Sequence, residues 1–193
     1  MLNKIFVSDV RVKILKIMLL SPDKSLHVRA IVRAVGAEIN AVRRELDNLI
    51  DVGLLTRRQS SNRIYYTVNT LHPFFGDLLA LMAKEDVLAT KFYKSMKDLG
   101  RIEFAVLSKA FLRGRKSTAL DVDLFVVGGI NLPLLEKIVK EEEARIGREI
   151  NYSVMESEEF MGRKRTADQF IERLMSQGRT MLVGDEEKFC SII

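Results

Sequence analysis

The sequence contains little cysteine and proline, no tryptophan and no long apolar run. Of its 193 residues, one is Cys, three are Pro and none is Trp. A lone Cys190 cannot form an internal disulfide, which favours a reducing compartment, and we expect a cytoplasmic protein. No apolar stretch approaches the roughly 20 residues of a membrane-spanning helix, so we expect no membrane partner. Charged side chains also interrupt what would be the apolar part of a signal peptide at Asp9, Arg11, Lys13 and Lys16.

The charges are ordinary in number but uneven along the chain. Hydrophobic residues make up 47% and charged residues 30%, which is typical of a chain that builds a core. Residues 1–84 contain 13 Lys and Arg against 7 Asp and Glu, a net charge of +6, whereas residues 85–193 contain 18 against 19, a net charge of −1. This asymmetry predicts a polyanionic partner for the N-terminal part, although an acidic protein would also satisfy the charge.

Apolar spacing in the N-terminal part predicts three helices. Ser8 is expected to cap the first helix, and Gly36 and Gly53 are expected to end the second and third. The residues predicted to face inward are Val10, Ile14, Ile17 and Met18 in the first helix, Ile31, Val32 and Val35 in the second, and Ile39, Val42, Leu46, Leu49 and Ile50 in the third.

A hairpin and a further helical segment are predicted after the third helix. Two strands, Leu54–Arg58 and Arg63–Val68, flank a polar tip at Gln59–Asn62. From residue 71 to residue 99 the pattern is helical again, in two pieces that meet near Lys84–Asp86. The apolar residues from Phe74 to Met82 predict that this segment either packs on the N-terminal domain or forms a dimer seam.

Strands and helices alternate from residue 100 onward. The predicted strands are Ile102–Leu107, Asp121–Val127, Glu149–Val154 and Thr180–Val183, and the predicted helices are Leu132–Ile146, 156–162 and 165–177. The expected fold class is therefore α+β: a domain of helices and a hairpin at 1–70, linking or dimerisation helices at 71–99, and a small α/β domain at 100–193.

The order of short helices, tight turn and hairpin from Ser8 to Asn69 resembles the ArsR/MarR-like winged helix-turn-helix regulators. The similarity is greatest in the run Leu46–Leu55, because families of this type end their recognition helix with the pattern Leu-x-x-Leu…Gly-Leu-Leu. The resemblance implies a transcriptional regulator that places its third helix in the major groove of DNA.

The face of the third helix opposite its apolar residues carries side chains that suit base recognition. Arginine pairs bidentately with guanine and asparagine with adenine. The candidates on this face are Asn40, Arg43, Arg44 and Asn48. Three more arginines flank the hairpin tip, where a wing meets phosphates or the minor groove: Arg57, Arg58 and Arg63. Any one of them alone would suit a solvated surface, but together with the helix order they predict a double-stranded DNA partner.

Roughly residues 100–185 resemble the minimal members of the polymerase-beta-like nucleotidyltransferase superfamily. The resemblance rests on three segments, Phe104–Gly114, Leu120–Gly128 and Gly147–Val154. It implies a Gly-Ser turn that holds a triphosphate and three acids that hold two magnesium ions. By this resemblance, Ser108 is the serine of the turn, and Asp121 and Asp123 are the paired acids.

Two positions depart from the superfamily pattern. Leu107 stands where the glycine belongs, and its side chain would crowd a phosphate. The third acid has three candidate positions, Glu149, Asn151 and Ser153, of which Asn151 matches best, and a neutral amide weakens a magnesium site. We therefore expect a degenerate domain that requires no cofactor and binds a nucleotide effector or mediates protein contacts, with magnesium at Asp121 and Asp123 as the alternative.

These features predict a homodimeric DNA-binding transcriptional regulator. An alternative from a different class is an active magnesium-dependent nucleotidyltransferase that the winged helix brings to its target. A third hypothesis is an antitoxin-like partner protein, since minimal nucleotidyltransferase-like domains resemble components of such pairs.

Overall fold

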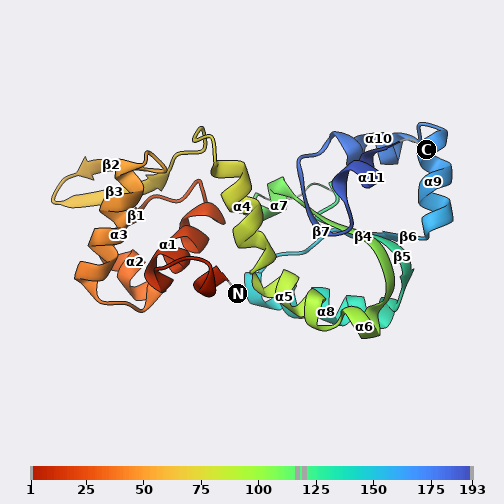
Figure 1. The fold of residues 1–193 in the computed structure, drawn as a ribbon, viewed down its shortest axis with the longest axis horizontal. Helices are drawn as coiled ribbons and strands as arrows, with labels where there is room; N and C mark the ends of the chain where they lie inside the picture. The colour runs from red at the N-terminus through yellow and green to blue at the C-terminus, as the bar shows by residue number, and fades with distance from the viewer. Residues whose placement is uncertain (1, 116–117, 119–120, 192–193) are drawn as a thin grey trace. The chain divides into compact units, whose positions relative to one another are not determined.

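The computed structural model describes residues 2–115, 118 and 121–191, and the chain divides into two compact units, Met1–Glu85 and Asp86–Ile193. Each unit contains one β-sheet, so the fold is mixed α+β with two sheets (Figure 1). None of the described helices has the length and apolar character that crossing a bilayer demands.

The first unit combines helices with a three-stranded antiparallel sheet of order β1-β3-β2. Its elements are η1 (Leu2–Lys4), α1 (Asp9–Leu19), β1 (Leu26–His27), α2 (Val28–Val35), α3 (Ile39–Asp51), β2 (Leu55–Ser60), β3 (Arg63–Val68) and α4 (Phe75–Lys84). The predicted helices and hairpin of this unit are confirmed. Local capping explains two of the boundaries: the Ser8 hydroxyl accepts a hydrogen bond from the Arg11 amide, and Gly36 ends α2 at a φ of 66°, in the left-handed region that glycine adopts without strain.

The hairpin turn is shorter than predicted. Ser60 pairs with Arg63, so the turn consists of Ser61 and Asn62, and the predicted four-residue tip is wrong because its first two residues belong to β2. Ser61 has a φ of 51°, and such left-handed backbone allows two antiparallel strands to be joined by two residues.

The inward stripe predicted for α1 is only partly right. Ile14 and Met18 are buried, but Val10 and Ile17 are half-buried. Further residues of α1 are buried instead, namely Val12, Leu15 and Leu19. The physical reason is that α1 contacts α4 as well as α2 and α3, so helices cover a second side of it. In α3 the buried residues are Val42, Leu46 and Leu49, whereas the predicted Ile39 and Ile50 are half-buried.

The segment predicted as linking helices is divided between the two units. The two helical pieces do meet at residues 84–86, but α4 belongs to the first unit, and α5 (Val87–Lys94) and α6 (Met96–Leu99) belong to the second. The buried residues of α4 are Phe75, Leu79, Met82 and Ala83. Because α4 contacts α1, its apolar face packs within its own unit, which was one of the two alternatives for this segment.

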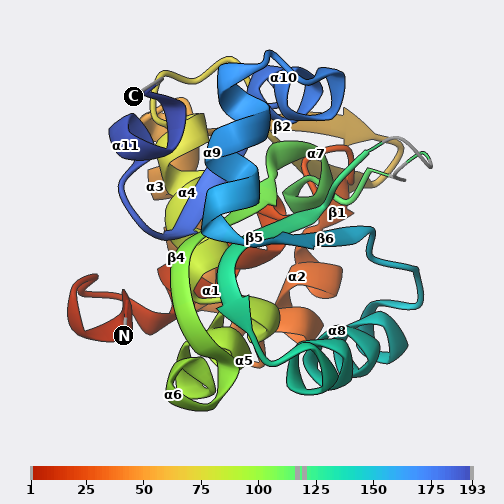
Figure 2. The same cartoon turned by 90° about the vertical axis from the view of Figure 1, so that its right-hand side faces the viewer.

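The second unit is built on a four-stranded sheet of order β6-β5-β4-β7, in which only the described pair β5–β6 is parallel. After α5 and α6 its elements are β4 (Gly100–Ser108), α7 (Lys109–Leu112), β5 (Leu124–Ile130), α8 (Leu132–Ile146), β6 (Tyr152–Met155), α9 (Ser157–Arg165), α10 (Gln169–Ser176), β7 (Arg179–Val183) and α11 (Glu186–Cys190). Helices α9, α10 and α11 lie on one side of this sheet, and α5, α6 and α8 lie on the other (Figures 1 and 2).

Ion pairs explain why α5 belongs to the second unit. Arg145 on α8 bonds both to Asp86, at 3.3 Å just before α5, and to the buried carboxylate of Glu142. Lys91 on α5 also pairs with Glu141 on α8 at 2.6 Å. These contacts agree with the division of the chain after Glu85, before α5, whereas the sequence predicted a boundary near residues 99–100.

Two predicted strands of the second unit begin later than expected. Strand β5 starts at Leu124, so Asp121 and Asp123 precede the strand and do not alternate along it, and β6 starts at Tyr152. The short helices α7 and α11, of four and five residues, were not predicted, because so few residues carry no helical period. The predicted helix Leu132–Ile146 is confirmed as α8.

Candidate nucleic-acid interface

Helix α3 presents the side chains that were predicted to contact bases. Because Val42, Leu46 and Leu49 are buried, the opposite face of the helix is exposed. The exposed residues of this face are Asn40, Arg43, Arg44, Asp47 and Asn48. A carboxylate caps the helix: Glu38 Oε2 accepts hydrogen bonds from the amides of Asn40, at 2.8 Å, and of Ala41, at 3.1 Å.

The side chains predicted to contact bases from α3 differ in their hydrogen bonds and ion pairs within the unit. Within the described part of the chain, no ion pair or hydrogen bond engages the side chain of Arg43 or Arg44. Asn48, in contrast, donates from its amide nitrogen to Glu45 Oε2 at 3.4 Å, and the same oxygen binds Arg11 Nε at 2.7 Å. Asn48 is thus tied to the ion pair that joins α1 to α3, whereas the two arginines are available to a ligand.

The hairpin arginines lie on two opposite faces. Side chains alternate along a strand, and Arg57 pairs with Tyr66 whereas Arg58 pairs with Tyr65. Leu55 and Tyr66 are buried on the face that packs against the helices, so Arg57 extends from this inner face. Arg58 lies on the outer face, and so does the third arginine of the hairpin, Arg63.

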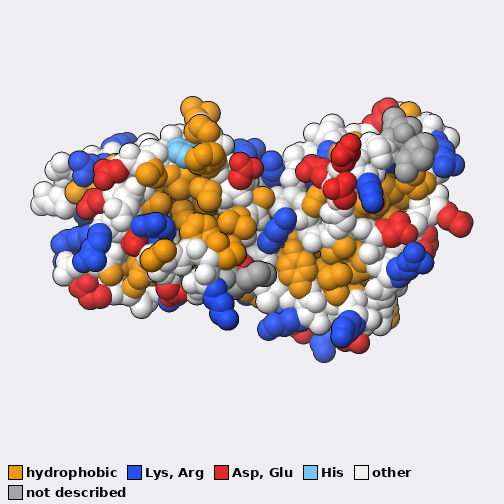
Figure 3. Space-filling model, viewed as in Figure 1, with side chains coloured by type: hydrophobic (Ala, Val, Ile, Leu, Met, Phe, Trp, Pro, Cys, Tyr) orange, Lys and Arg blue, Asp and Glu red, His pale blue; other side chains and the backbone are white. Residues whose placement is uncertain are grey.

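Helix α3 contacts β2, so charged side chains of α3 and of the hairpin lie close to each other. Burial raises the pKa of the Tyr66 hydroxyl, and the negative charge of Asp47 raises it further, whereas the positive charges of Arg57 and Arg43 act to lower it. One hydroxyl therefore senses charges from both α3 and β2. Figure 3 shows several Lys and Arg side chains over α3 and the hairpin on the side in view. We call Arg43, Arg44 and Arg57 the arginine surface.

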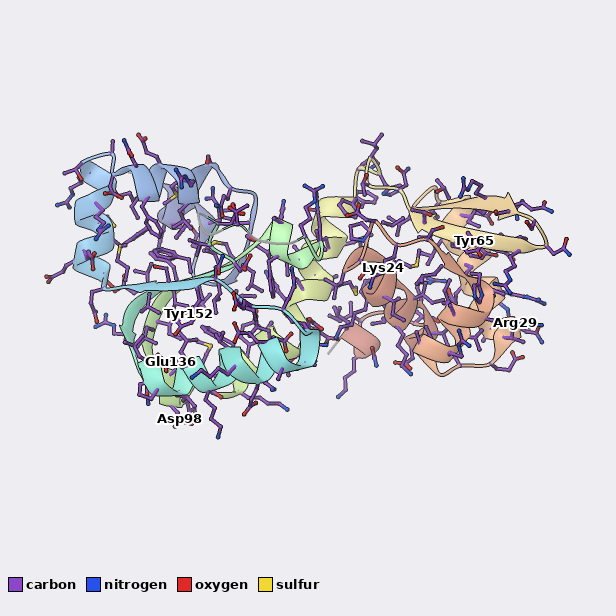
Figure 4. All side chains as sticks on the ribbon, turned by 180° about the vertical axis from the view of Figure 1, so that it is seen from behind. Lys24, Arg29, Tyr65, Asp98, Glu136 and Tyr152 are labelled. Carbon is purple, nitrogen blue, oxygen red and sulfur yellow. The ribbon has the colours of Figure 1, made fainter. Side chains whose placement is uncertain are left out.

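The outer face of the sheet is polar and aromatic. Tyr65, labelled in Figure 4 together with Lys24 and Arg29 of the same unit, packs edge-on against His27 with ring centroids 5.9 Å apart. Beside them, the Thr67 hydroxyl donates to the Ser25 hydroxyl at 3.1 Å. With Arg58 and Arg63 on this outer face and Arg57 on the inner face, the hairpin carries arginines on both faces.

The residues that resemble nucleotidyltransferase positions meet at one end of the second sheet. The Ser108 amide donates to the Asp123 carbonyl at 2.9 Å, and the Asp123 amide donates to the Asn151 carbonyl at 2.7 Å. The backbone N–H of Asn151 donates in return to Asp123 Oδ2 at 3.0 Å. The structure therefore brings together the predicted Ser108, Asp123 and Asn151. Leu120, the first residue of the segment Leu120–Gly128 that carries part of the resemblance, lies outside the described residues.

These side chains are occupied by hydrogen bonds within the unit. Asp121 Oδ2 accepts from the amide and the hydroxyl of Thr118, at 2.7 and 2.9 Å, and these bonds, with the charge of Arg173, hold the pKa of Asp121 below its usual value. The Asn151 side-chain nitrogen donates to the Thr118 carbonyl at 2.8 Å. Ser108 is buried and caps α7, because its hydroxyl accepts from the Phe111 amide at 3.0 Å.

This donor set does not fit a site for two magnesium ions. Magnesium needs several oxygen ligands in octahedral geometry, and the third position holds an amide whose nitrogen is bonded to Thr118. Asp123 is 1% exposed, and its carboxylate accepts a backbone hydrogen bond. Among residues 2–115, 118 and 121–191, no three acidic, His or Cys side chains form a metal-binding group. No metal-dependent step follows from these residues.

A shallow depression of 420 Å³ lies beside Asp121. Its lining residues are Asp121, Val122, Ile150, Asn151, Tyr152, Ser153 and Phe170. Burial raises the pKa of the Tyr152 hydroxyl, and the charge of Glu136 together with a hydrogen bond to it raises it further. Figure 4 shows Tyr152 on β6 above Glu136 on α8. The sequence pattern did not predict the contact of Tyr152 with Glu136, since the two residues lie on different elements, 16 positions apart.

Comparison of the chain with protein-family models, with curated proteins and with solved structures finds no match. Its function is therefore inferred from its own side chains and their geometry.

Proposed function

We propose that the protein is a DNA-binding transcriptional regulator whose first unit is a winged helix-turn-helix domain. The element order supports this proposal, because α2 and α3 are separated only by residues 36–38 and are followed by a two-stranded hairpin. In such a domain the second of the two helices enters the major groove and the hairpin is the wing. An α-helix with its side chains is about 10–12 Å in diameter, which suits a major groove about 12 Å wide, and the 13 residues of α3 make it about 20 Å long.

The observation that carries the proposal is the arginine surface. Arg43, Arg44 and Arg57 are exposed, extend from two adjacent elements and form no ion pair within the described part of the chain. Unpaired guanidinium groups favour phosphates and guanine edges, and their binding to DNA releases counterions.

The capping carboxylate of Glu38 indicates which part of α3 contacts bases. It occupies the first amides of the helix and places a negative charge where a phosphate would otherwise bind. A DNA backbone should therefore avoid this end of the helix. We infer that Arg43 and Arg44, one turn further along, contact base edges more closely than Asn40 does.

We propose that the second unit has a nucleotidyltransferase-like fold and no transferase activity. The order β4–α7–β5–α8–β6, with Asp121 and Asp123 just before β5, supports the likeness. Leu107, which is buried, and Asn151, whose amide is bonded to Thr118, argue against catalysis. The unit would then mediate contacts with other molecules or bind an effector.

Binding to a fluorescent duplex of mixed sequence tests the proposed function. We expect salt-dependent binding by the parent protein, because the arginine surface contacts phosphates, and weaker binding by the triple variant Arg43→Ala, Arg44→Ala and Arg57→Ala. Lys140→Ala, at an exposed position on α8, is the matched control for the loss of a positive charge. The proposal fails if the triple variant binds as tightly as the control.

A further inference from the structure

A cavity of 320 Å³ in the second unit is separate from the depression beside Asp121. Its lining residues are Lys164, Ala167, Ile171, Glu172, Met175, Arg179 and Cys190, which come from α9, the turn after it, α10, β7 and α11. Its volume is at the lower end of the range found for small-molecule sites, about 300–1,000 Å³.

One end of the cavity holds a buried lysine. Lys164 is 7% exposed, and its Nζ donates to the carbonyls of Phe189, at 2.6 Å, and of Ser191. Among the described residues no carboxylate pairs with this ammonium. The Phe160 ring also faces this ammonium, with its centroid 5.2 Å from Nζ, but neither the ring nor the two carbonyls carries a compensating negative charge.

A second cation at the same end also has spare donors. Arg179 donates from Nη1 to the Cys190 sulfur, at 3.0 Å, and from Nη2 to the Met175 carbonyl. Its Nε is buried and has no hydrogen-bond partner among the described residues. Lys164 bonds to the carbonyls of residues 189 and 191 and Arg179 bonds to Cys190 between them, so both positive charges lie at one end of the cavity and favour an anion there.

The remaining wall of the cavity is largely apolar. Ile171 is 2% exposed, and Ala167 and Met175 continue the apolar surface. We propose that the cavity binds a small organic carboxylate, whose head group is held by Lys164 and Arg179 and whose apolar body packs on Ile171 and Met175. The lining carries two cations against the single acid Glu172, so its charge complements a monovalent anion. This proposal does not depend on DNA binding by the first unit.

The only cysteine of the chain provides a direct measurement. Cys190 is exposed and lines the cavity, so occupancy should shield it from the neutral reagent iodoacetamide. We expect octanoate or benzoate at millimolar concentration to slow alkylation of Cys190 in a saturable manner. The matched neutral probes octanamide and benzamide should slow it far less, because they cannot pair with the two cations.

Two variants test the role of charge. Lys164→Met should weaken octanoate binding, measured by calorimetry, by at least about tenfold, because it removes the buried one of the two lining cations. Glu172→Gln, at an exposed position, should tighten binding by about twofold, since it removes a repelling charge. Lys140→Met is the control and should leave octanoate affinity unchanged.

Three results would overturn the carboxylate site. The first is that neither carboxylate protects Cys190, and the second is that amides and carboxylates protect it equally, which would show an apolar cavity without anion selectivity. The third is that Glu172→Gln does not alter octanoate affinity. The third result remains decisive even if circular dichroism shows that Lys164→Met unfolds the second unit. Duplex affinity, measured separately, reports on the proposed function alone.

Discussion

Arg57 on β2 lies directly opposite Tyr66 on β3, on the hairpin face that packs against the helices. Tyr66 is 6% exposed, β2 contacts α3, and the charges of Arg43 and Asp47 on α3 also act on the pKa of the Tyr66 hydroxyl, so this pair lies close to α3. Arg58, the next residue along β2, lies on the other face of the same strand. The two neighbouring arginines should therefore have different roles in the proposed DNA binding.

The first prediction compares these two arginines. Arg57→Ala should weaken binding to every duplex and lower the slope of log K against log salt by about 0.9, the value for one lost phosphate contact. Arg58→Ala is the matched control on the outer face and should change the slope less. Anisotropy titrations over a range of salt concentrations give both slopes. A larger effect for Arg58→Ala would contradict the placement of Arg57 on the DNA-facing surface.

The second prediction concerns pH and the carboxylate of Glu45. Burial raises the pKa of Glu45, but hydrogen bonds from Ser8, Arg11 and Asn48 and the charge of Arg11 outweigh this effect, so its pKa lies below the usual value. A lowered pKa means that ionised Glu45 stabilises the folded state above the unfolded pKa, about 4.3. This stabilisation is lost as the pH falls through the lower, folded pKa.

Urea unfolding of Glu45→Gln measures this effect. The variant should be less stable than the parent by about 1 kcal/mol at neutral pH, and the difference should shrink as the pH falls below about 4. Asp23→Asn, at an exposed position of the same unit, is the control and should show a smaller difference. A difference in unfolding free energy between Glu45→Gln and the parent that grows as the pH falls would contradict a lowered pKa of Glu45 in the folded state.

The third prediction concerns the end of α2. Gly36 has a φ of 66°, and a Cβ atom added there would meet no atom within 4 Å, so Gly36→Ala introduces backbone strain and no steric clash. We expect a loss of about 1 kcal/mol in thermal or urea unfolding. Gly36→Asn should lose less, because asparagine tolerates left-handed backbone better than alanine. Equal losses for the two variants would contradict a purely conformational role.

The fourth prediction concerns the chemistry of the second unit. With magnesium and labelled nucleoside triphosphates, the parent protein should transfer no label to protein or nucleic acid, because the third position holds Asn151 and the turn holds Leu107. Asp121→Ala is the matched variant and should behave like the parent. Transfer by the parent that Asp121→Ala abolishes would show that the unit is an enzyme.

Local signals made part of the fold predictable. The Ser8 cap, the glycine at residue 36 and the regular apolar spacing of Leu132–Ile146 act within a few residues, and the structure confirms each of them. The stripe of α1 was misjudged because α4, far along the chain, covers a second side of that helix. Periodicity within a helix cannot indicate how many neighbours it has.

The sites depend more on long-range contacts than the helices do. The exposed face of α3 follows from its apolar period, but the separation of Arg57 from Arg58 and Arg63 required the strand register. Asp123 was expected within a strand, but it precedes β5 and bonds to Asn151, 28 residues away. The cavity at Lys164 was not predicted, because its lining residues come from several elements and share no sequence pattern.

The central claim is that α3 recognises bases, and binding of a selected duplex tests it most directly. The duplex would be selected from a random library by the parent protein, and affinities for it and for a scrambled duplex would be compared. We expect Arg43→Ala and Arg44→Ala each to weaken binding to the selected duplex by about 1–3 kcal/mol and to reduce the preference over the scrambled one. Unchanged preference in both variants, with Lys140→Ala behaving like the parent, would contradict base recognition by α3.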